Sequence, residues 1–192
     1  MHMLIADDHA LHRDLMRAKL ESAYPEATIH EAEDYAQVKS ACAKYKPKLL
    51  SLDLFMPGMG VLMGVHEIIQ QFPETDVLIC SAVDNAILVA TLLAFGIKGY
   101  ISKSMPAEML MEAIDRVLHG GTYVPEPYRS TSVRLTRRQS EILGMICSGL
   151  SNKEIAQRLD VSVSTVKFHT GLILEALGVQ NRQQAMSLCG LA

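Results

Sequence analysis

Three carboxylates stand where two short apolar runs of this sequence end. Asp7 and Asp8 directly follow the run Met3–Ala6, and Asp53 lies near the end of the run Leu49–Leu54. Carboxylates held close together repel one another, and a hard divalent cation such as Mg²⁺ relieves that repulsion. Such a cation can steady a phosphoryl group that arrives on one of the carboxylates. These residue types therefore favour phosphoryl chemistry at a magnesium site.

A hydroxyl and an ammonium group follow two further apolar runs. Ser81 comes directly after Val77–Cys80, and Lys103 follows Gly99–Ile101. On the same edge as the carboxylates they would complete a set of partners for phosphate oxygens. Any one of these residues alone is more often a helix cap or a surface residue, so the prediction depends on all five together.

The elements that must position these side chains alternate regularly over the first 118 residues. Five apolar runs of strand length are Met3–Ala6, Thr28–Ala32, Leu49–Leu54, Val77–Cys80 and Gly99–Ile101. Between and after them lie helical patterns at Leu11–Ser22, Tyr35–Tyr45, Val61–Phe72, Ala86–Phe95 and Ala107–Leu118. This alternation predicts an α/β fold with a doubly wound, five-stranded parallel sheet, whose functional side chains gather at the carboxyl ends of the strands. We expect Asp84 to cap the fourth helix and Gly96 to end it.

The pattern changes after residue 118. Residues 119–133 are rich in Gly, Pro and Ser, which predicts a connector without helix or strand. Residues 134–192 read as four helices with a tight turn before the third, and this layout is typical of a helix-turn-helix. Two capping boxes mark where the first two of these helices begin, Thr136 with Gln139 and Ser151 with Glu154. The predicted domains are 1–118 and 134–192, joined by 119–133.

Composition and charge narrow the class of protein. With 49% hydrophobic and 20% charged residues, the sequence is typical of a soluble globular protein. Its longest stretch without a charged residue has 13 residues and its start lacks a signal-peptide pattern, so we expect a cytoplasmic protein without membrane contact. The four cysteines form no metal-ligand pair and no expected disulfide. Residues 134–192 hold seven basic and four acidic residues, a weak indication that this part meets a polyanion.

At the residues with candidate chemistry, the first 118 residues resemble the receiver domain of bacterial two-component response regulators. The matching segments are Ala6-Asp7-Asp8-His9, Leu52-Asp53-Leu54-Phe55-Met56-Pro57-Gly58-Met59, Cys80-Ser81-Ala82 and Gly99-Tyr100-Ile101-Ser102-Lys103. Two positions depart from the usual pattern: Gly60 stands where these domains carry Asp, and Ser104 where many carry Pro. His9 and His12 are expected to be surface or capping residues.

The resemblance implies a role for each residue of the candidate site. Asp53 would accept a phosphoryl group from a histidine kinase, and Mg²⁺ would be bound by Asp7, Asp8, Asp53 and the backbone carbonyl of Phe55. Lys103 and Ser81 would hold the phosphoryl oxygens, and Tyr100 would be the aromatic switch residue, for which a half-buried place at the sheet edge is the alternative.

From Leu135 to Leu188 the chain resembles the LuxR-type helix-turn-helix of NarL/FixJ regulators. The resemblance is carried by Leu135-Thr136, Glu141-Ile142-Leu143, Gly149-Leu150-Ser151-Asn152-Lys153-Glu154-Ile155-Ala156, Ser164-Thr165-Val166-Lys167, His169, Leu177-Gly178-Val179, Asn181-Arg182 and Ala185. In such motifs the second helix enters the major groove. The candidate DNA contacts are Ser164, Thr165, Lys167, His169 and Arg182; for His169 a structural role, and for Arg182 a salt bridge, are the alternatives.

These observations lead to one main hypothesis and two alternatives. The main hypothesis is a transcription regulator, not an enzyme, that is phosphorylated on Asp53 and binds double-stranded DNA as a homodimer. A regulator that binds DNA without phosphate is less favoured, because the full set of site residues is present. A Mg²⁺-dependent phosphohydrolase is disfavoured, because Asp53-Leu54-Phe55 lacks a second acid and no segment is long enough for a cap over a substrate.

Overall fold

The protein was analysed as a computed structural model that describes residues 1–192 except 84, 130–134 and 189–192. Its contacts divide the chain into two compact units. The first comprises residues 1–59, 67–82 and 97–125, and the second comprises residues 60–66, 83–96 and 126–192.

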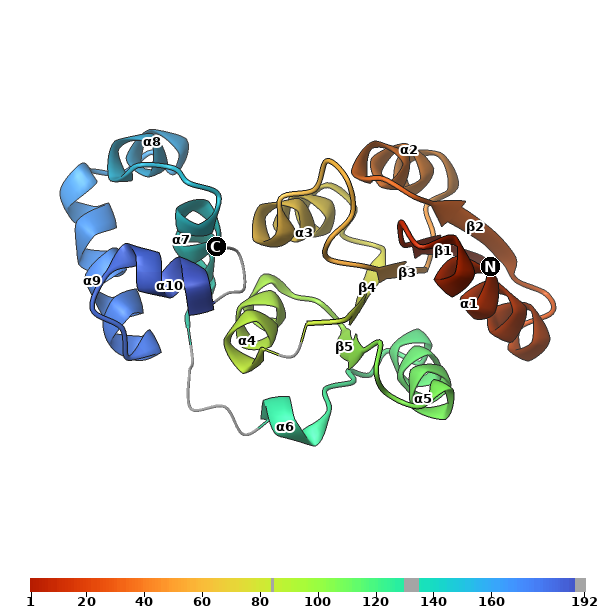
Figure 1. Ribbon diagram of the computed structural model, residues 1–192. Helices are drawn as coiled ribbons and strands as arrows, with labels where there is room; N and C mark the ends of the chain where they lie inside the picture. Colours follow the sequence, from red (N-terminus) through yellow and green to blue (C-terminus); the bar gives the residue numbers. More distant parts are fainter. Residues whose placement is uncertain (84, 130–134, 189–192) are drawn as a thin grey trace. The chain divides into compact units, whose positions relative to one another are not determined.

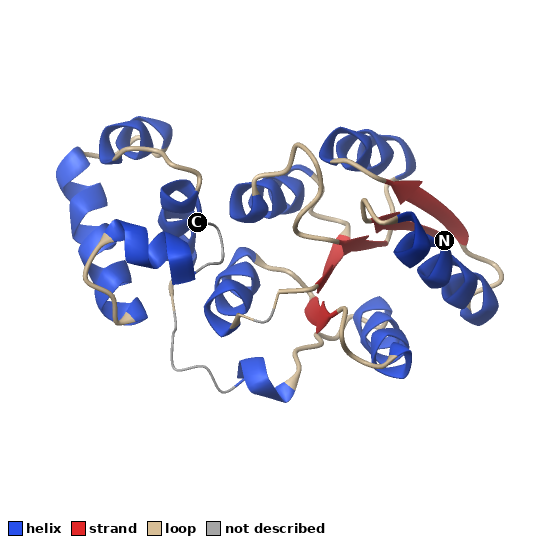
Figure 2. Cartoon of the chain, viewed as in Figure 1, coloured by secondary structure: helices blue, strands red, loops and turns tan. Residues whose placement is uncertain are grey.

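The first unit contains a five-stranded parallel sheet, drawn as arrows in Figures 1 and 2. Its strands are β1 (His2–Ala6), β2 (Thr28–Ala32), β3 (Leu49–Leu52), β4 (Asp76–Ser81) and β5 (Gly99–Ser102). They lie in the order β2-β1-β3-β4-β5, and every neighbouring pair is parallel. The chain therefore moves outward in one direction from β1 and then in the other, which confirms the predicted doubly wound sheet.

Helices cover both faces of this sheet. On one face, α1 (Ala10–Ala23) and α5 (Ala107–Leu118) pack against Met3 and Ile5 of β1 in one hydrophobic cluster. On the other side, α2 (Tyr35–Tyr45) contacts β1 and β2 and buries Val38 and Cys42 (Figure 1). Strands β3, β4 and β5 are buried at nearly every position, as expected for strands covered on both faces.

The predicted helices agree closely with those of the structure. Helices α2, α4 (Ala86–Phe95) and α5 have the predicted bounds, and α3 (Val61–Gln71) ends one residue early. Gly96 ends α4 in the left-handed conformation, as predicted, with φ of 109°. The predicted cap was wrong: Asn85 caps α4 by accepting hydrogen bonds from Ile87 and Leu88, while Asp84 lies outside the described residues.

The connector prediction needs a correction as well. One turn of helix, α6 (Glu126–Arg129), forms inside residues 119–133, and Tyr123 bridges to Gly99 of β5. The second position of α6 is Pro127, and the first turn of a helix tolerates proline because its N–H groups have no partner within the helix. Tyr123 and Tyr128 are buried, so two aromatic side chains anchor the described part of this stretch.

The C-terminal part of the second unit is all helical. It contains α7 (Arg137–Cys147), α8 (Asn152–Arg158), α9 (Val163–Leu177) and α10 (Arg182–Leu188). Both predicted capping boxes are present, at Thr136 before α7 and at Ser151 before α8. Helix α9 contacts α7, α8 and α10, and its buried residues are Val166, Ile173 and Leu177. These contacts confirm the predicted all-helical fold of this part.

The cysteines and the helix lengths agree with the remaining expectations. Cys42, Cys80 and Cys147 are free thiols, and Cys189 lies outside the described residues. Among the described residues, no helix combines the length and the apolar character needed to cross a membrane.

Candidate functional site

The acidic residues meet Lys103 at the carboxyl ends of the central strands. Because β1 and β3 are neighbours, the backbone N–H of Asp53 donates to the carbonyl of Ala6, 2.8 Å away, which places Asp53 beside Asp7. The Nζ atom of Lys103 lies 2.7 Å from Asp7 Oδ2 and 2.8 Å from Asp53 Oδ2. Both carboxylates are almost fully buried, with 2% and 4% of their surface exposed. One ammonium group therefore bridges two buried carboxylates.

Hydrogen bonds fix the charges of this cluster. Burial alone would raise the pKa of Asp7, but the close approach of His12 and hydrogen bonds from Lys103 and the backbone of His9 bring it well below its usual range. Burial likewise works against the charge of Lys103, yet its bonds to Asp53 and Asp7 raise its pKa overall. The Asp53 carboxylate is also held by the backbone N–H of Leu54, which donates to Oδ1 over 2.7 Å. Asp53 is therefore oriented by a backbone donor and a cation.

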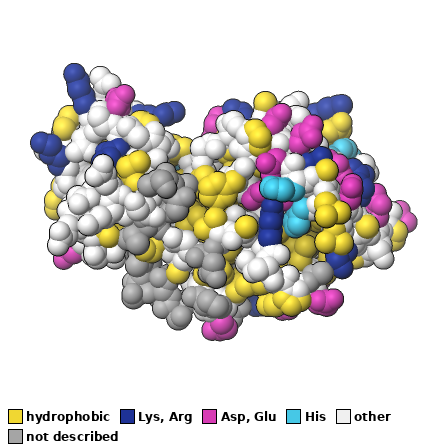
Figure 3. Space-filling model, viewed as in Figure 1, with side chains coloured by type: hydrophobic (Ala, Val, Ile, Leu, Met, Phe, Trp, Pro, Cys, Tyr) yellow, Lys and Arg dark blue, Asp and Glu magenta, His cyan; other side chains and the backbone are white. Residues whose placement is uncertain are grey.

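Two histidines join this cluster, which the sequence analysis did not foresee. His12 Nδ1 lies 2.6 Å from Asp7 Oδ2, and His9 Nδ1 lies 2.8 Å from Asp8 Oδ1. His9 is exposed, as expected for a surface residue, and it precedes α1 without making a side-chain capping hydrogen bond. The sequence signal that could have predicted these contacts is the position of both histidines at the start of the helix after β1, close to the aspartates that follow the strand. Figure 3 shows histidine, acidic and basic side chains crowded together on the first unit.

The donor set fits a divalent cation. Ligand atoms of Asp7, Asp8, His9 and Asp53 all lie within 4.8 Å of one another. Carboxylate oxygens are the ligands that Mg²⁺ prefers, and three of these four residues supply them. Phe55, whose carbonyl is the expected fourth ligand, follows the buried Leu54 in the loop after β3.

Ser81 and Tyr100 lie in neighbouring strands and are both completely buried. Ser81 ends β4 and pairs with Ser102, while Tyr100 in β5 pairs with Ile79. The carbonyl of Ser81 accepts a hydrogen bond from the backbone N–H of Lys103, 2.9 Å away, which connects Ser81 to the acidic cluster. The half-buried edge position considered for Tyr100 does not match the structure, because its ring is fully enclosed.

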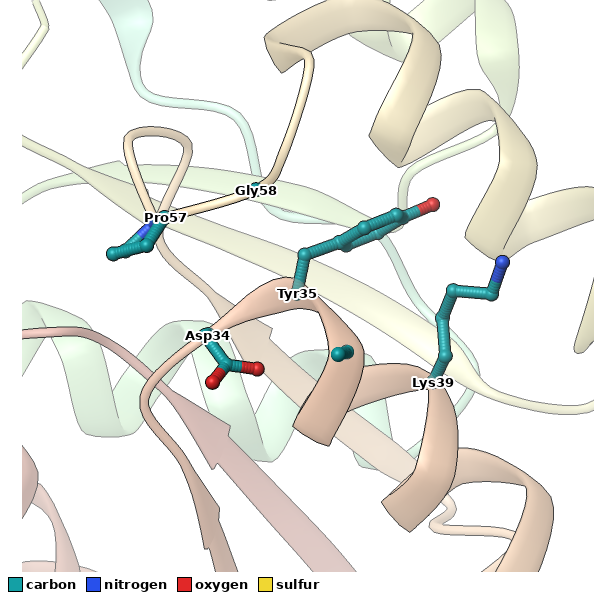
Figure 4. Close-up of a pocket in the computed structure, with 6 residues that line it drawn as sticks. Asp34, Tyr35, Lys39, Pro57 and Gly58 are labelled. Atoms are coloured by element: carbon teal, nitrogen blue, oxygen red, sulfur yellow. The ribbon is translucent and has the colours of Figure 1, made fainter.

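One of the hollows on the first unit lies at the acidic cluster and includes Asp53 in its lining. That hollow combines four polar or charged side chains with four apolar ones; its lining is His9, Leu11, His12, Leu15, Asp53, Phe55, Ala82 and Lys103. Another, shown in Figure 4, lies between the start of α2 and the loop after β3 and is lined by Asp34, Tyr35, Ala36, Lys39, Pro57 and Gly58. Tyr35 and Lys39 both bind Glu67 there, at 2.7 and 2.6 Å, so their polar atoms are already partnered.

The helix-turn-helix is built by α8, a turn at Asp160 and α9. Asp160 adopts a left-handed conformation with φ of 50°, which reverses the chain within four residues. Ser162 caps α9, and its Oγ accepts from the backbone N–H of Thr165. The Oγ atom of Ser162 also lies within 2.8 Å of the hydroxyl groups of Ser164 and Thr165. Four side-chain and backbone groups thus fix the first turn of α9.

The candidate DNA contacts differ in how freely they face solvent. Lys167 and Ser164 are exposed on α9, whereas Thr165 and His169 are half-buried. The guanidinium group of Arg182 donates to the carbonyl of Ile146, 3.0 Å away, and to that of Leu150. The exposed aromatic ring of Phe168 was missed by the sequence analysis, which looked for polar contacts on this helix.

Comparisons with known proteins agree with both parts of this picture. Residues 3–115 match the family described as "Response regulator receiver domain", and residues 133–189 match "Bacterial regulatory proteins, luxR family". A glycerol metabolism activator of Pseudomonas putida is 33% identical over 208 aligned positions, covering 98% of this chain and 94% of the relative. The oxygen regulatory protein NreC of Staphylococcus aureus (strain JH9) is 34% identical, covering 96% and 94% of the two chains.

Solved structures show the same fold. RcsB of Salmonella enterica serovar Typhimurium, bound to a promoter in the presence of a phosphomimetic, superposes with a TM-score of 0.68 at 23% identity. The superposition covers 99% of this chain and 98% of that one. Receiver and LuxR-type families together define transcription regulators rather than enzymes. The chain therefore belongs to the NarL/FixJ-type response regulators of two-component systems, which join a receiver domain to a LuxR-type DNA-binding domain.

Proposed function

We propose that a sensor histidine kinase phosphorylates this protein on Asp53, and that the phosphorylated protein regulates transcription by binding double-stranded DNA as a homodimer. The observation that carries the proposal is the bridge from Lys103 to Asp53 and Asp7 at the sheet edge. Because the proposed target is DNA, we place the protein in the bacterial cytoplasm. We assign the receiver to residues 1–118, the linker to 119–133 and the DNA-binding domain to 134–192.

Each residue of the acidic cluster has a role in the proposed transfer. An oxygen of Asp53 attacks the phosphorus of the phosphohistidine, forming an O–P bond while the P–N bond to the kinase imidazole breaks. Lys103 is already within hydrogen-bond distance of Asp53 and would follow the phosphoryl oxygens, while the hydroxyl of Ser81 would donate to another of them. Asp7, Asp8, Asp53 and the carbonyl of Phe55 would hold Mg²⁺, whose charge would offset the negative charge of the phosphoryl group.

The DNA-binding part supports the second half of the proposal. Helix α9 would enter the major groove with its N-terminal turns near the bases. Lys167 is exposed there and would meet a base or a phosphate, while the hydroxyl groups of Ser164 and Thr165 would meet phosphates. His169 and Arg182 would act nearer the edge of the interface, and the bonds of Arg182 to α7 also orient α10. With one exposed Lys on the helix, a single copy would bind weakly, which is why we propose a dimer on paired half-sites.

The phosphorylation claim is tested with a small phosphoryl donor. Purified protein is incubated with acetyl phosphate and Mg²⁺, and its intact mass and the modified peptide are determined by mass spectrometry. We expect one phosphoryl group on Asp53 in the wild type and none in Asp53→Asn. The exposed helix residue Asp115, changed to Asn, is the matched control and should leave phosphorylation unchanged. Phosphate on another residue, or none at all, would contradict the proposal.

A further inference from the structure

Phe168 is a large apolar side chain that the surrounding helices leave in solvent. Its surface is 64% exposed, well above the 38% and 36% of Val163 and Leu172, the other exposed large apolar residues of α9. Scattered exposed apolar residues are common and need no explanation by themselves. What lies around Phe168 therefore decides whether its exposure has a function.

Gly171 follows Phe168 by three residues and lies on the same face of α9. A Cβ atom built at Gly171 would meet nothing within 4 Å, and its φ is not positive, so the described residues give no steric reason for a glycine. Glycine in the middle of a helix lowers its stability relative to alanine. The chain therefore keeps an open space beside Phe168 at a cost to the helix.

The charges around this space favour a polyanion as the occupant. Lys167 directly precedes Phe168 and is exposed. The only acidic residue in α9 is Glu175, in its last turn, so residues 163–174 offer no carboxylate that would repel phosphates. A protein partner would need further apolar area, whereas α9 adds only the partly exposed Val163 and Leu172 to Phe168. The first two turns of α9 instead carry the hydroxyl groups of Ser164 and Thr165 and the exposed Lys167. We therefore choose DNA over a protein surface as the partner of this face.

We propose that Phe168 reads thymine, by placing its ring against the 5-methyl group in the major groove, with Gly171 leaving room for the base edge to approach. The inference rests on the proposed function, because it requires α9 to bind DNA. The thymine methyl group is the one apolar feature that bases present in the major groove, and phenylalanine is among the side chains that contact it. Phe168 lies within the first two turns of α9, the part of such a helix that reaches base edges.

The test removes only the 5-methyl group of thymine from the DNA. Full-length protein with acetyl phosphate and Mg²⁺ first selects binding sites from a random duplex library. The preferred duplex is then synthesised again with each thymine of the selected motif replaced in turn by deoxyuridine. Burial of one methyl group corresponds to an affinity change of about fourfold, or about fifteenfold for two half-sites changed together. We expect a loss of this size at one thymine position of each half-site.

Substituted variants then test whether Phe168 is the residue that contacts the thymine at that position. Phe168→Ala should bind the thymine and deoxyuridine duplexes equally at that position, and sites selected by this variant should lose the thymine. Leu172→Ala, which also shortens an exposed apolar side chain of α9, is the matched control and should keep the full ratio. Lys167→Ala should weaken binding to every duplex and reduce the slope of log K against log salt by about 1 per copy, with the ratio unchanged.

The possible results distinguish a failure of the inference about Phe168 from a failure of the proposed function. A Phe168→Ala variant that still distinguishes thymine from deoxyuridine at that position would overturn the inference and leave the proposed function intact. A change in oligomeric state on Phe168→Ala without a change in base preference would also overturn it, and would make this face a protein interface. If the wild type selects no sequence at all, the proposed function fails, and the inference with it.

Discussion

At the scale of single residues, Lys103 is the group that lets two buried carboxylates lie side by side. It contacts Asp7 and Asp53 within 2.8 Å and is the one cation recorded within ion-pair distance of Asp53 in the described residues. Removing one partner of a buried ion pair leaves the other charge uncompensated, at a cost of about 3 kcal/mol. The stability of the first unit should therefore depend on Lys103 and on the ionisation of Asp7.

The sign of the pH dependence follows from the two shifted pKa values. The pKa of Asp7 is lowered from 3.8, so its contribution to stability is complete above pH 3.8 and is lost as pH falls through the folded value. The pKa of Lys103 is raised from 10.5, so its contribution is complete below pH 10.5 and is lost as pH rises through the folded value. Both contributions are present together between these two limits.

We predict that Lys103→Met lowers the free energy of unfolding by about 3 kcal/mol at pH 7. The difference from wild type should shrink as pH is lowered through 3.8, because a protonated Asp7 no longer needs a cation. Urea unfolding in the presence of a chelator, from pH 3 to pH 7, measures both effects. Lys98→Met, at an exposed position, should be close to neutral. A Lys103→Met difference that stays constant over this pH range would contradict the electrostatic interpretation.

The buried thiols give a second prediction at the same scale. Burial raises the pKa of both Cys42 and Cys80 to about 12, and the thiolate is the nucleophilic form. In native protein at pH 8, iodoacetamide should therefore leave these two cysteines unmodified, whereas protein unfolded in urea should react at all four. Peptide mass mapping measures the modification. Rapid native labelling of Cys80 would show that the sheet beneath the acidic cluster opens readily.

At the scale of elements, the start of α9 depends on a single hydroxyl group. Ser162 Oγ accepts from the N–H of Thr165 and lies beside two further hydroxyls. Loss of an N-cap of this kind costs about 1 kcal/mol. We predict that Ser162→Ala lowers stability by that amount and weakens DNA binding, because the first turn of α9 frays.

The same experiment has a control within the first turn of α9. Ser164→Ala removes a hydroxyl that contacts only Ser162 among the described groups, so its effect on stability should be several tenths of a kcal/mol at most. Thermal unfolding of the two variants separates the cap from its neighbour. Equal destabilisation by both would mean that Ser162 does not act as the cap.

Elements with clear boundary signals could be predicted from the sequence. Helix α2 begins after Asp34 and α4 ends at Gly96. Aspartate is favoured just before the start of a helix and glycine just after its end. The cap of α4 was assigned one residue early, because Asp84 and Asn85 are both good caps and the local pattern does not distinguish them. Helix α6 was missed because it is a single turn in a stretch rich in Pro, where burial of Tyr128 outweighs local preference.

The candidate site, too, could be predicted only in part from the sequence. Asp7, Asp53 and Lys103 could be brought together from strand order alone, because parallel strands end at one edge of the sheet. The contact of His12 with Asp7 depends on how α1 turns back over β1, which residue spacing does not specify. Phe168 was given no role from the sequence, and only the packing of α9 on α7, α8 and α10 shows that its side chain faces outward.

At the scale of the whole molecule, charge separates the two proposed activities. Residues 1–133 hold 11 basic and 17 acidic residues, whereas residues 134–192 hold seven basic and four acidic ones. The acidic part suits a cation and a phosphoryl group, and the basic part suits DNA. Because α9 carries few cations, the proposed function includes two copies on DNA, and a phosphate on Asp53 would then control DNA binding by controlling association.

The central claim is that phosphate on Asp53 controls the assembly of two copies. Light scattering of full-length protein, with and without acetyl phosphate and Mg²⁺, tests it most directly when Asp53→Asn is run beside the wild type and phosphate on Asp53 is confirmed by mass spectrometry. We predict a shift from monomer to dimer in the phosphorylated wild type and no shift in the variant. An unchanged molar mass in fully phosphorylated wild type, or a dimer in both proteins without phosphate, would contradict the account.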